Sequence, residues 1–174
     1  YNDIEVKNLW KERVVNGDAD PEVLLDAIRF RSRDNARTPM QWDDSQHAGF
    51  TVGTPWLKVN PNYKEINVKE ALEDPDSIFY YMKSLIQMRK ANEVAVYGDF
   101  REYEPENESL YIYERNYEDK KMFVVLNFTE HKVPFHMPEG LNAGGAALLI
   151  DNYKGDAALE DRMMRPYEAA VYVM

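Results

Sequence analysis

Residues 122–128 read Met-Phe-Val-Val-Leu-Asn-Phe, and no polar residue interrupts the apolar run from Phe123 to Leu126. β-Branched and aromatic residues fit a pleated strand well. An apolar residue at every position, rather than at every second one, indicates a strand that is buried on both faces. We therefore expect this segment to be the central strand of a β-sheet.

On both sides of this segment, from about residue 94 onwards, apolar and polar residues alternate with the period of two that is typical of strands. The predicted strands are residues 94–97, 109–114, 122–128, 133–137, 147–150 and 167–173. They are separated by turn residues such as Gly98-Asp99 and Pro138-Glu139-Gly140. We therefore predict an all-β antiparallel Greek-key sandwich over residues 94–174, able to fold as a unit of its own.

The first 93 residues carry helical signals instead. Asn2 or Asp3 can cap a first helix, and Asp20-Pro21-Glu22 is a typical start of a second one. A third helix is predicted with Asp74 as its N-cap and Pro75 in its first turn. Its apolar stripe is Ile78, Tyr81, Met82, Leu85 and Met88. Burial of five such side chains contributes on the order of 10 kcal/mol, so the stripe needs a partner surface, either the rest of a larger protein or a second copy.

Between Ser32 and about Asn62 the helical period disappears. Loops of this length are uncommon in compact domains and are usually functional or disordered. This one begins with Arg33-Asp34-Asn35-Ala36-Arg37-Thr38-Pro39-Met40-Gln41-Trp42-Asp43. Arg side chains hold carboxylates or hydroxyls in fixed geometry, and Trp offers a flat apolar face, so the residue types suit a polar, ring-shaped ligand. The alternative is an Arg–Asp network that only fixes the loop.

The order of residues in this loop is similar to that of a known family. The segment 33–43 is followed by His47-Ala48-Gly49-Phe50, Pro55-Trp56-Leu57 and residues 59–68, and the chain closes with Arg165-Pro166-Tyr167-Glu168-Ala169. This pattern resembles the oligo-1,6-glucosidase group of the α-amylase superfamily, glycoside hydrolase family 13, over nearly the whole chain. Trehalose-6-phosphate hydrolases, dextran glucosidases and sucrose isomerases share these motifs, so the alternatives in substrate stay open.

The resemblance implies a fold. Members of the family are retaining α-glucosidases in which an Asp nucleophile and a Glu acid/base lie on the strands of a (β/α)8 barrel, and a β domain follows the barrel. A barrel takes about 250 residues, and its catalytic motifs are absent here. The resemblance thus implies an α+β fragment, with residues 1–93 as the tail of the catalytic barrel (the loop after the eighth strand and the eighth barrel helix) and residues 94–174 as the C-terminal β-sandwich.

The resemblance also implies a role for one side chain. In the family the second Arg of the loop motif, here Arg37, pairs with an acid on an early barrel loop and closes the glucose pocket. Arg37 is therefore the expected substrate-binding residue, and Arg33 is the second candidate. Asp34 is expected to be the ion-pair partner of one of them. The partners would be an oligosaccharide substrate, bound by the complete enzyme, and the remainder of the catalytic barrel, without which the chain is expected to be inactive.

No catalytic residue is expected in the chain itself. Retaining glycoside hydrolysis needs two carboxyl groups about 5–5.5 Å apart. Asp43 and Asp44 are adjacent in a loop and would point apart, and Glu104, Glu106 and Glu108 alternate in an exposed Pro-containing segment. The three histidines are widely separated: His47, His131 and His136. They lack the ligand spacing of a zinc site, so we expect neither a metal nor another cofactor.

The composition of the chain excludes some classes of binding partner and favours one cellular location. Lys and Arg total 21 against 31 Asp and Glu, which gives a net charge of −10. This charge repels nucleic acid and anionic lipid, so neither nucleic acid nor a membrane is an expected partner. There is no apolar run near 18 residues, and the sequence contains no Cys. A cytoplasmic enzyme is therefore expected.

A different class of function also fits the sequence. Tyr111 and Tyr113 would share one face of a strand and could form the platform of a non-catalytic glucan-binding β-sandwich module. Burial in the core or at the barrel interface is the other interpretation of these two side chains. The same choice between stacking and core applies to the three tryptophans, Trp10, Trp42 and Trp56.

Overall fold

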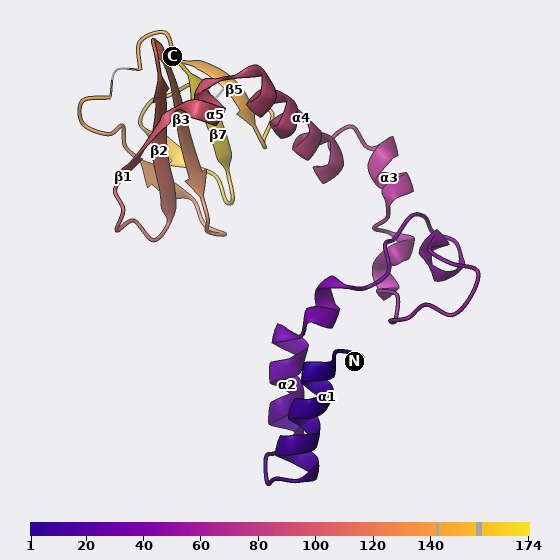
Figure 1. The fold of residues 1–174 in the computed structure, drawn as a ribbon. Coiled ribbons are helices and arrows are strands. Elements are labelled where there is room, and N and C mark those ends of the chain that lie inside the picture. Colours follow the sequence, from indigo (N-terminus) through magenta and orange to yellow (C-terminus); the bar gives the residue numbers. More distant parts are fainter. Residues whose placement is uncertain (142, 156–157) are drawn as a thin grey trace. The chain divides into compact units, whose positions relative to one another are not determined.

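The computed structural model describes residues 1–141, 143–155 and 158–174. Contacts between residues divide the chain into two compact units, Tyr1–Phe79 and Tyr80–Met174 (Figure 1). The predicted division between residues 93 and 94 was based on the change of sequence period, and it stays a prediction. We describe each unit by itself.

The first unit is built from helices and a long loop. Helix α1 (Ile4–Trp10) continues into the π-helical turn η1 (Lys11–Val15), and α2 (Pro21–Arg31) follows. The predicted caps are confirmed: the Asp3 carboxylate accepts from the Glu5 N–H at 2.8 Å, and the Asp20 carboxylate accepts from the Glu22 N–H at 2.8 Å. The remaining elements are η2 (Arg33–Ala36), η3 (Gln46–Gly49), η4 (Pro61–Lys64) and α3 (Val68–Glu73).

The third predicted helix starts later than expected. It is α4 (Ile78–Ala91), while Asp74 is the C-cap of α3. The Asp74 carboxylate accepts from the Asp76 N–H at 2.9 Å, which forms a local turn, and Pro75 has no N–H with which to continue α3. The prediction that Asp74 caps the helix and Pro75 lies in its first turn is therefore wrong. The local Asp turn competes with the helix.

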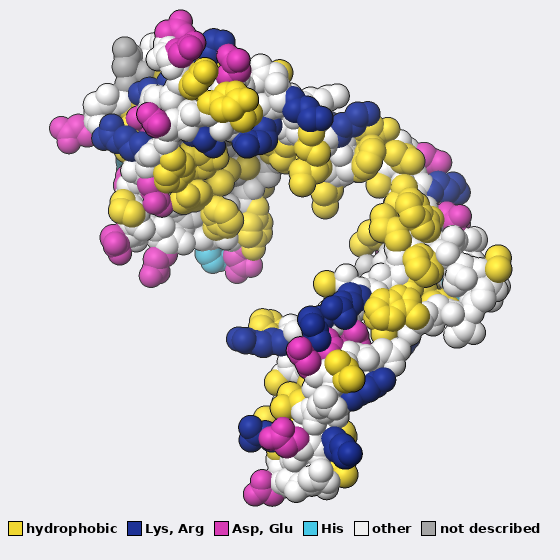
Figure 2. Space-filling view, in the orientation of Figure 1, with side chains coloured by type: hydrophobic (Ala, Val, Ile, Leu, Met, Phe, Trp, Pro, Cys, Tyr) yellow, Lys and Arg dark blue, Asp and Glu magenta, His cyan; other side chains and the backbone are white. Residues whose placement is uncertain are grey.

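The apolar stripe of α4 is exposed in part, since Tyr81, Leu85 and Met88 are half-buried. No residue of this helix is buried, and Ile78 and Met82 expose 87% and 56% of their surface. Figure 2 shows hydrophobic side chains at the surface along this helix. Exposed apolar area of this kind is typical of a surface that another part of a protein covers. That the stripe needs such a partner surface stays a prediction.

The second unit contains a five-stranded antiparallel sheet with the order β1-β2-β3-β7-β5. Its strands are β1 (Asp99–Tyr103), β2 (Leu110–Tyr117), β3 (Lys120–Asn127), β5 (Ala147–Asp151) and β7 (Ala169–Val173). Strand β3 lies in the middle, where Val124 is opposite Tyr113 on one side and Val171 on the other. Residues 122–125 are all buried. The predicted central strand is confirmed.

A second, two-stranded sheet consists of β4 (Val133–Phe135) and β6 (Arg162–Met164). Both sheets contribute to one core, which contains Leu110, Ile112, Phe123, Val125, Phe135, Met164, Ala170 and Tyr172. The chain thus combines helices with antiparallel sheets, as the fold class predicted. The Greek-key connection and the barrel stay predictions.

Residues 94–97, predicted as a strand, form the helical turn α5 (Val94–Tyr97). Val94 and Ala95 are both buried, and they pack with Met122, Val124 and Val171 of the sheet. Two consecutive buried residues fit a helical turn that packs on a sheet. The strand prediction failed because four residues are too few to distinguish a hydrophobic period of 2 from one of 3.6. The strands β1 and β6 were not predicted.

Candidate functional site

The candidate site begins at the turn η2, which carries the two predicted arginines. Ser32 caps this turn, because its hydroxyl accepts from the Asp34 N–H at 3.2 Å. The Asn35 side-chain amide donates to the Arg29 carbonyl of α2 at 2.8 Å. The Arg37 N–H donates to the Asp34 carbonyl at 3.1 Å, so the turn ends directly before the Arg37 side chain.

Asp34 does not form the predicted ion pair with Arg33 or Arg37. It is 4% exposed, and its Oδ2 accepts from the backbone N–H groups of Asn2 and Asp3 at 2.5 Å and 2.9 Å. These donors precede α1, where free N–H groups are available. The prediction was wrong because the donors come from residues 31 and 32 positions away, which no local pattern indicates.

Arg33 is engaged by carboxylates of the same unit. Its Nε and Nη2 donate to the two carboxylate oxygens of Asp3 at 2.7 Å and 2.9 Å, and Nη2 lies 3.2 Å from Glu5. The hydrogen bond from Arg33 is the main cause that lowers the pKa of Asp3 to about 2 from its ordinary 3.8, and the same hydrogen bond raises the pKa of Arg33. Half of the Arg33 side chain is exposed, so the guanidinium also has an accessible side.

Arg37 is exposed, and within the described residues its guanidinium makes no hydrogen bond and no ion pair. Its positive charge still contributes to the lowered pKa of Asp3, after the larger effects of Arg33 and Glu5. The guanidinium therefore lies within electrostatic reach of the Asp3 carboxylate. An Arg in this state can donate paired hydrogen bonds to a carboxylate or to sugar hydroxyls.

The rest of the loop is held by Asp43. Its carboxylate accepts from the Ser45 hydroxyl and the Ser45 N–H, at 2.5 Å and 2.9 Å, and both bonds lower the pKa of Asp43. The Cβ of any residue at position 49 would lie 2.8 Å from this carboxylate, and Gly49 has a φ of +65°. Asp43 is thus a structural acceptor in a tight turn.

Trp42 and Trp56 are about half exposed, and Trp10 is partly exposed. None of the three is buried among the described residues, and the choice between stacking and core stays open for the complete protein. The backbone at Trp42 is fixed, because its N–H donates to the Ala48 carbonyl and its carbonyl accepts from the Lys69 N–H. Exposed indole faces on a fixed backbone are suited to stacking against a sugar ring.

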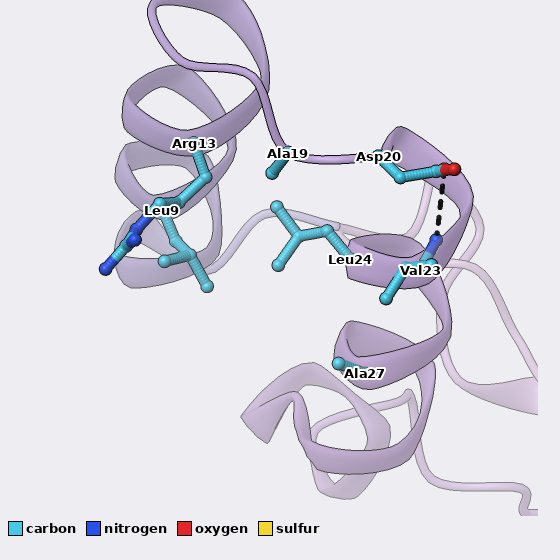
Figure 3. A pocket seen from close by; sticks show the side chains of 7 residues that line it. All are labelled: Leu9, Arg13, Ala19, Asp20, Val23, Leu24 and Ala27. Carbon is cyan, nitrogen blue, oxygen red and sulfur yellow. Dashed lines mark hydrogen bonds between the residues drawn. The ribbon is translucent and has the colours of Figure 1, made fainter.

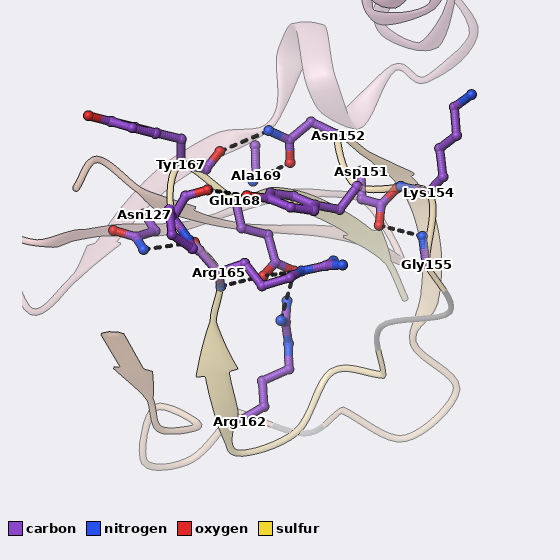
Figure 4. Close-up of polar contacts among 12 residues, drawn as sticks. Asn127, Asp151, Asn152, Lys154, Gly155, Arg162, Arg165, Tyr167, Glu168 and Ala169 are labelled. Atoms are coloured by element: carbon purple, nitrogen blue, oxygen red, sulfur yellow. Dashed lines mark hydrogen bonds and ion pairs between the residues drawn. The ribbon is translucent and has the colours of Figure 1, made fainter. Parts of the chain in front are cut away.

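Glu168 is a buried carboxylate that sequence reasoning missed. Figure 4 shows Arg162 and Arg165 converging on it. It accepts from Arg162 Nη1 at 2.8 Å and from the N, Nε and Nη2 of Arg165 at 2.7, 3.1 and 3.1 Å. Burial alone would raise the pKa of Glu168, but these hydrogen bonds outweigh it and hold the pKa below its ordinary value. Only the closing motif around residue 168 pointed to this region.

Glu114 is another carboxylate of this kind. Burial would raise its pKa, but Lys121, Asn116 and Tyr103 donate to it at 2.9, 3.1 and 2.8 Å and lower it. A general acid of a glycosidase needs a raised pKa. Glu114 and Glu168 are therefore structural anions of the β-sheet unit.

The first unit also contains an apolar cavity of about 400 Å³. It is lined by Leu9, Arg13, Ala19, Asp20, Val23, Leu24 and Ala27. In Figure 3, Leu24 of α2 points towards α1, and Asp20 is turned back to its own helix. Asp20 already caps α2, so this cavity offers few polar groups for a sugar.

Among the described residues, no group of three or more His, Asp or Glu side chains is arranged to hold a metal ion. Within the same residues, no helix is both long and apolar enough to cross a lipid bilayer.

Comparisons with known proteins identify the family. The family model for the alpha amylase catalytic domain matches residues 2–98. An oligo-1,6-glucosidase of Bacillus cereus is 49% identical over 99% of this chain and 31% of its own length. The chain thus spans about a third of the length of such curated relatives.

Solved structures agree in fold. The trehalose-6-phosphate hydrolase of Bacillus licheniformis superposes with a TM-score of 0.90 at 38% identity, over 99% of this chain and 32% of that one. A trehalulose synthase of Pseudomonas mesoacidophila MX-45 superposes with a TM-score of 0.90 at 37% identity, over 100% and 32%. The chain therefore belongs to the α-amylase family, glycoside hydrolase family 13, as an oligo-1,6-glucosidase-like segment.

Proposed function

We propose that the chain is the C-terminal part of a retaining α-glucosidase that hydrolyses short α-1,6-linked glucosides, the isomalto-oligosaccharides. It supplies an arginine to the substrate pocket and a stabilising β domain, and the catalytic carboxylates come from elsewhere in the enzyme. Similarity to oligo-1,6-glucosidases over 99% of the chain supports the substrate class. The lowered pKa values of Asp3, Asp43, Glu114 and Glu168 argue against any of these four carboxyl groups as the general acid, which needs a raised pKa.

The observation that carries the proposal is the state of Arg37. Arg33 already binds Asp3 and Glu5, whereas the guanidinium of Arg37 is exposed and makes no hydrogen bond within the described residues. Each charge-assisted hydrogen bond from such a group contributes roughly 1.5–3 kcal/mol. Arg37 is thus the first substrate-binding residue of the proposal, and Arg33, through its accessible side, is the second.

The proposal assigns one task to each part of the chain. Residues 1–93 form the tail of the catalytic barrel, whose remainder covers the exposed stripe of α4, and residues 94–174 form the β-sandwich domain. The match of the catalytic-domain model to residues 2–98 supports this division. Slow amide exchange along residues 78–88 in the full-length enzyme is expected, because the remainder of the barrel would bury them. Rapid exchange there would contradict the assignment.

The test of the substrate-binding role is Arg37→Lys in the full-length enzyme. Lys keeps the charge but has no planar fork, so we expect kcat/KM for isomaltose to fall by about 100-fold, the equivalent of one to two lost hydrogen bonds of the charged type. Lys11→Arg in the exposed turn η1 is the control for a basic substitution in the same unit. Unchanged kinetics of Arg37→Lys would assign Arg37 to the scaffold.

The proposal leaves several substrates open, because members of the family act on different glucosides. Relatives include a trehalose-6-phosphate hydrolase of Bacillus subtilis at 35% identity and a glucan 1,6-alpha-glucosidase of Streptococcus pneumoniae at 41%. A trehalose-6-phosphate hydrolase, a dextran glucosidase or a sucrose isomerase are therefore the alternative activities. Assay of the full-length enzyme on isomaltose, dextran, trehalose 6-phosphate and sucrose separates them. A cytoplasmic location stays a prediction that cell fractionation tests.

A glucan-binding module is the second candidate function, favoured by a ladder of aromatic rings on β1 and β2. The ring of Tyr113 lies 5.3 Å from that of Phe100 and 5.4 Å from that of Tyr111, measured between centroids. Phe100 and Tyr111 are exposed. Calorimetric titration of the chain with isomaltotriose and maltotriose tests this function, since binding that is lost in Tyr111→Ala would support it and the absence of heat would exclude it.

A further inference from the structure

The residues directly before α1 and the turn η2 are connected through two carboxylates. The Asp34 carboxylate accepts from the backbone N–H groups of Asn2 and Asp3. In the opposite direction, the Asp3 carboxylate accepts two hydrogen bonds from the Arg33 guanidinium. The turn η2 therefore cannot move relative to the start of α1 without breaking these four hydrogen bonds. We call the set of Asp3, Arg33 and Asp34 the anchor.

The anchor is directly connected to Arg37. Only Asn35 and Ala36 separate Asp34 from it, and the Arg37 N–H donates to the Asp34 carbonyl at 3.1 Å. The Arg37 guanidinium also lies within electrostatic reach of Asp3. A shift of the Asp34 backbone would consequently move the point from which the Arg37 side chain starts.

Asp34 contains an exceptional atom. Its Oδ1 is buried and has no hydrogen-bond partner among the described residues, while Oδ2 carries both backbone contacts. A buried acceptor without a donor is unfavourable for folding. Groups of this kind are concentrated where a fixed geometry serves function rather than stability.

We propose that Asp34 is a positioning residue for Arg37. Its carboxylate holds η2 against Asn2 and Asp3, directly before α1, so that the Arg37 guanidinium meets the glucoside in a single orientation. This inference rests on the proposed function, because it requires that Arg37 binds substrate. Misplacement of a binding group by about 1 Å lowers rates by as much as 100-fold, so loss of the anchor is expected to have a measurable effect on kcat/KM.

The experiment is a double-mutant cycle in the full-length enzyme with isomaltose as substrate. The variants are Asp34→Ala, Arg37→Ala and the combination of both. We expect Asp34→Ala to lower kcat/KM about tenfold when Arg37 is present and less than about twofold when Arg37 is absent. A role in general stability would lower kcat/KM by the same factor in both backgrounds, and that result would overturn the proposal.

A conservative variant separates the hydrogen bonds from the charge. In Asp34→Asn the amide oxygen can still accept from both backbone N–H groups, so kcat/KM is expected to stay within about threefold of wild type. A loss as large as that of Asp34→Ala would overturn the anchor mechanism. Asp34→Glu, which displaces the carboxylate by one methylene, is run through the same cycle with the same expectation, so that the test does not depend on the folding of Asp34→Ala.

The matched control is Asp26→Ala in α2. The Asp26 carboxylate is exposed and pairs with Arg29 on the surface, so its removal should leave kcat/KM unchanged. Failure of the inference and failure of the proposed function give different results. If Arg37→Ala is impaired while Asp34→Ala behaves like Asp26→Ala, only the positioning role is refuted. If Arg37→Ala retains wild-type kcat/KM, the binding role of Arg37 and the inference based on it are both refuted.

Discussion

The buried Glu168 in the second unit provides a quantitative test of what holds that unit together. We expect Glu168→Ala to lower the free energy of unfolding by about 3 kcal/mol. Glu168 has no exposed surface, and the side chains of Arg162 and Arg165 are 18% and 36% exposed. Removal of one partner from a buried ion pair costs about 3–5 kcal/mol. The lower end applies here, because water can solvate the partly exposed guanidinium of Arg165 once the carboxylate is gone.

The assay is urea unfolding of the 174-residue chain, followed by circular dichroism in the far ultraviolet. With a slope of about 1.5 kcal/mol per M, a loss of 3 kcal/mol moves the midpoint down by about 2 M. Glu139→Ala is the control, because Glu139 is exposed in a turn. A midpoint for Glu168→Ala that equals that of Glu139→Ala would refute the assigned role of the buried carboxylate.

The effect depends on pH in a defined direction. The pKa of Glu168 is held below its ordinary 4.5 in the folded state, so its contribution to stability is fully present above pH 4.5 and is lost as the pH falls through the lowered value. The difference in stability between wild type and Glu168→Ala should therefore be constant from neutral pH down to about 4.5 and shrink below it.

Two further predictions concern the first unit. The ion pair of Asp3 with Arg33 should stabilise the full-length enzyme above pH 3.8, and this stabilisation should be lost as the pH falls through about 2. Asp3→Asn should therefore lower the unfolding temperature at pH 6 and lower it less at pH 3. An equal lowering at both pH values would argue against the ion pair. Gly49→Ala should lower the free energy of unfolding by about 1–2 kcal/mol more than Gly53→Ala, as measured by thermal unfolding. The reason is that a Cβ at position 49 would lie 2.8 Å from the Asp43 carboxylate, whereas a Cβ at position 53 would lie 3.8 Å from its nearest atom. Equal effects of the two substitutions would contradict the tight turn.

The fold could be predicted where burial leaves a pattern in the sequence. Strand β3 is buried on both faces, so its apolar run is visible in the chain. Strand β1 is an exposed edge strand with the sequence Asp-Phe-Arg-Glu-Tyr, and β6 is only three residues long, so neither has a core-facing pattern that distinguishes it from a loop. The turn α5 is too short for its period to be recognised.

The candidate site could be predicted only in part. The types of residue in the loop are visible in the local sequence, but their hydrogen-bond partners lie far away along the chain. The residue types at 33–43 indicated a binding loop, and the family resemblance singled out Arg37 within it, which stays a prediction. The actual partner of Arg33 is Asp3, 30 positions earlier, and the partners of Asp34 are two backbone N–H groups. Any backbone N–H can be such a donor, so no side-chain pattern could have identified them.

The division of labour between this chain and the rest of the enzyme is tested most directly by turnover. We expect the purified 174-residue chain to release no glucose from isomaltose, while the full-length enzyme does so, because in the proposed function the chain supplies substrate-binding and structural groups and the catalytic carboxylates come from elsewhere in the enzyme. Release of glucose by the purified chain, above that of a heat-denatured sample, would contradict this account.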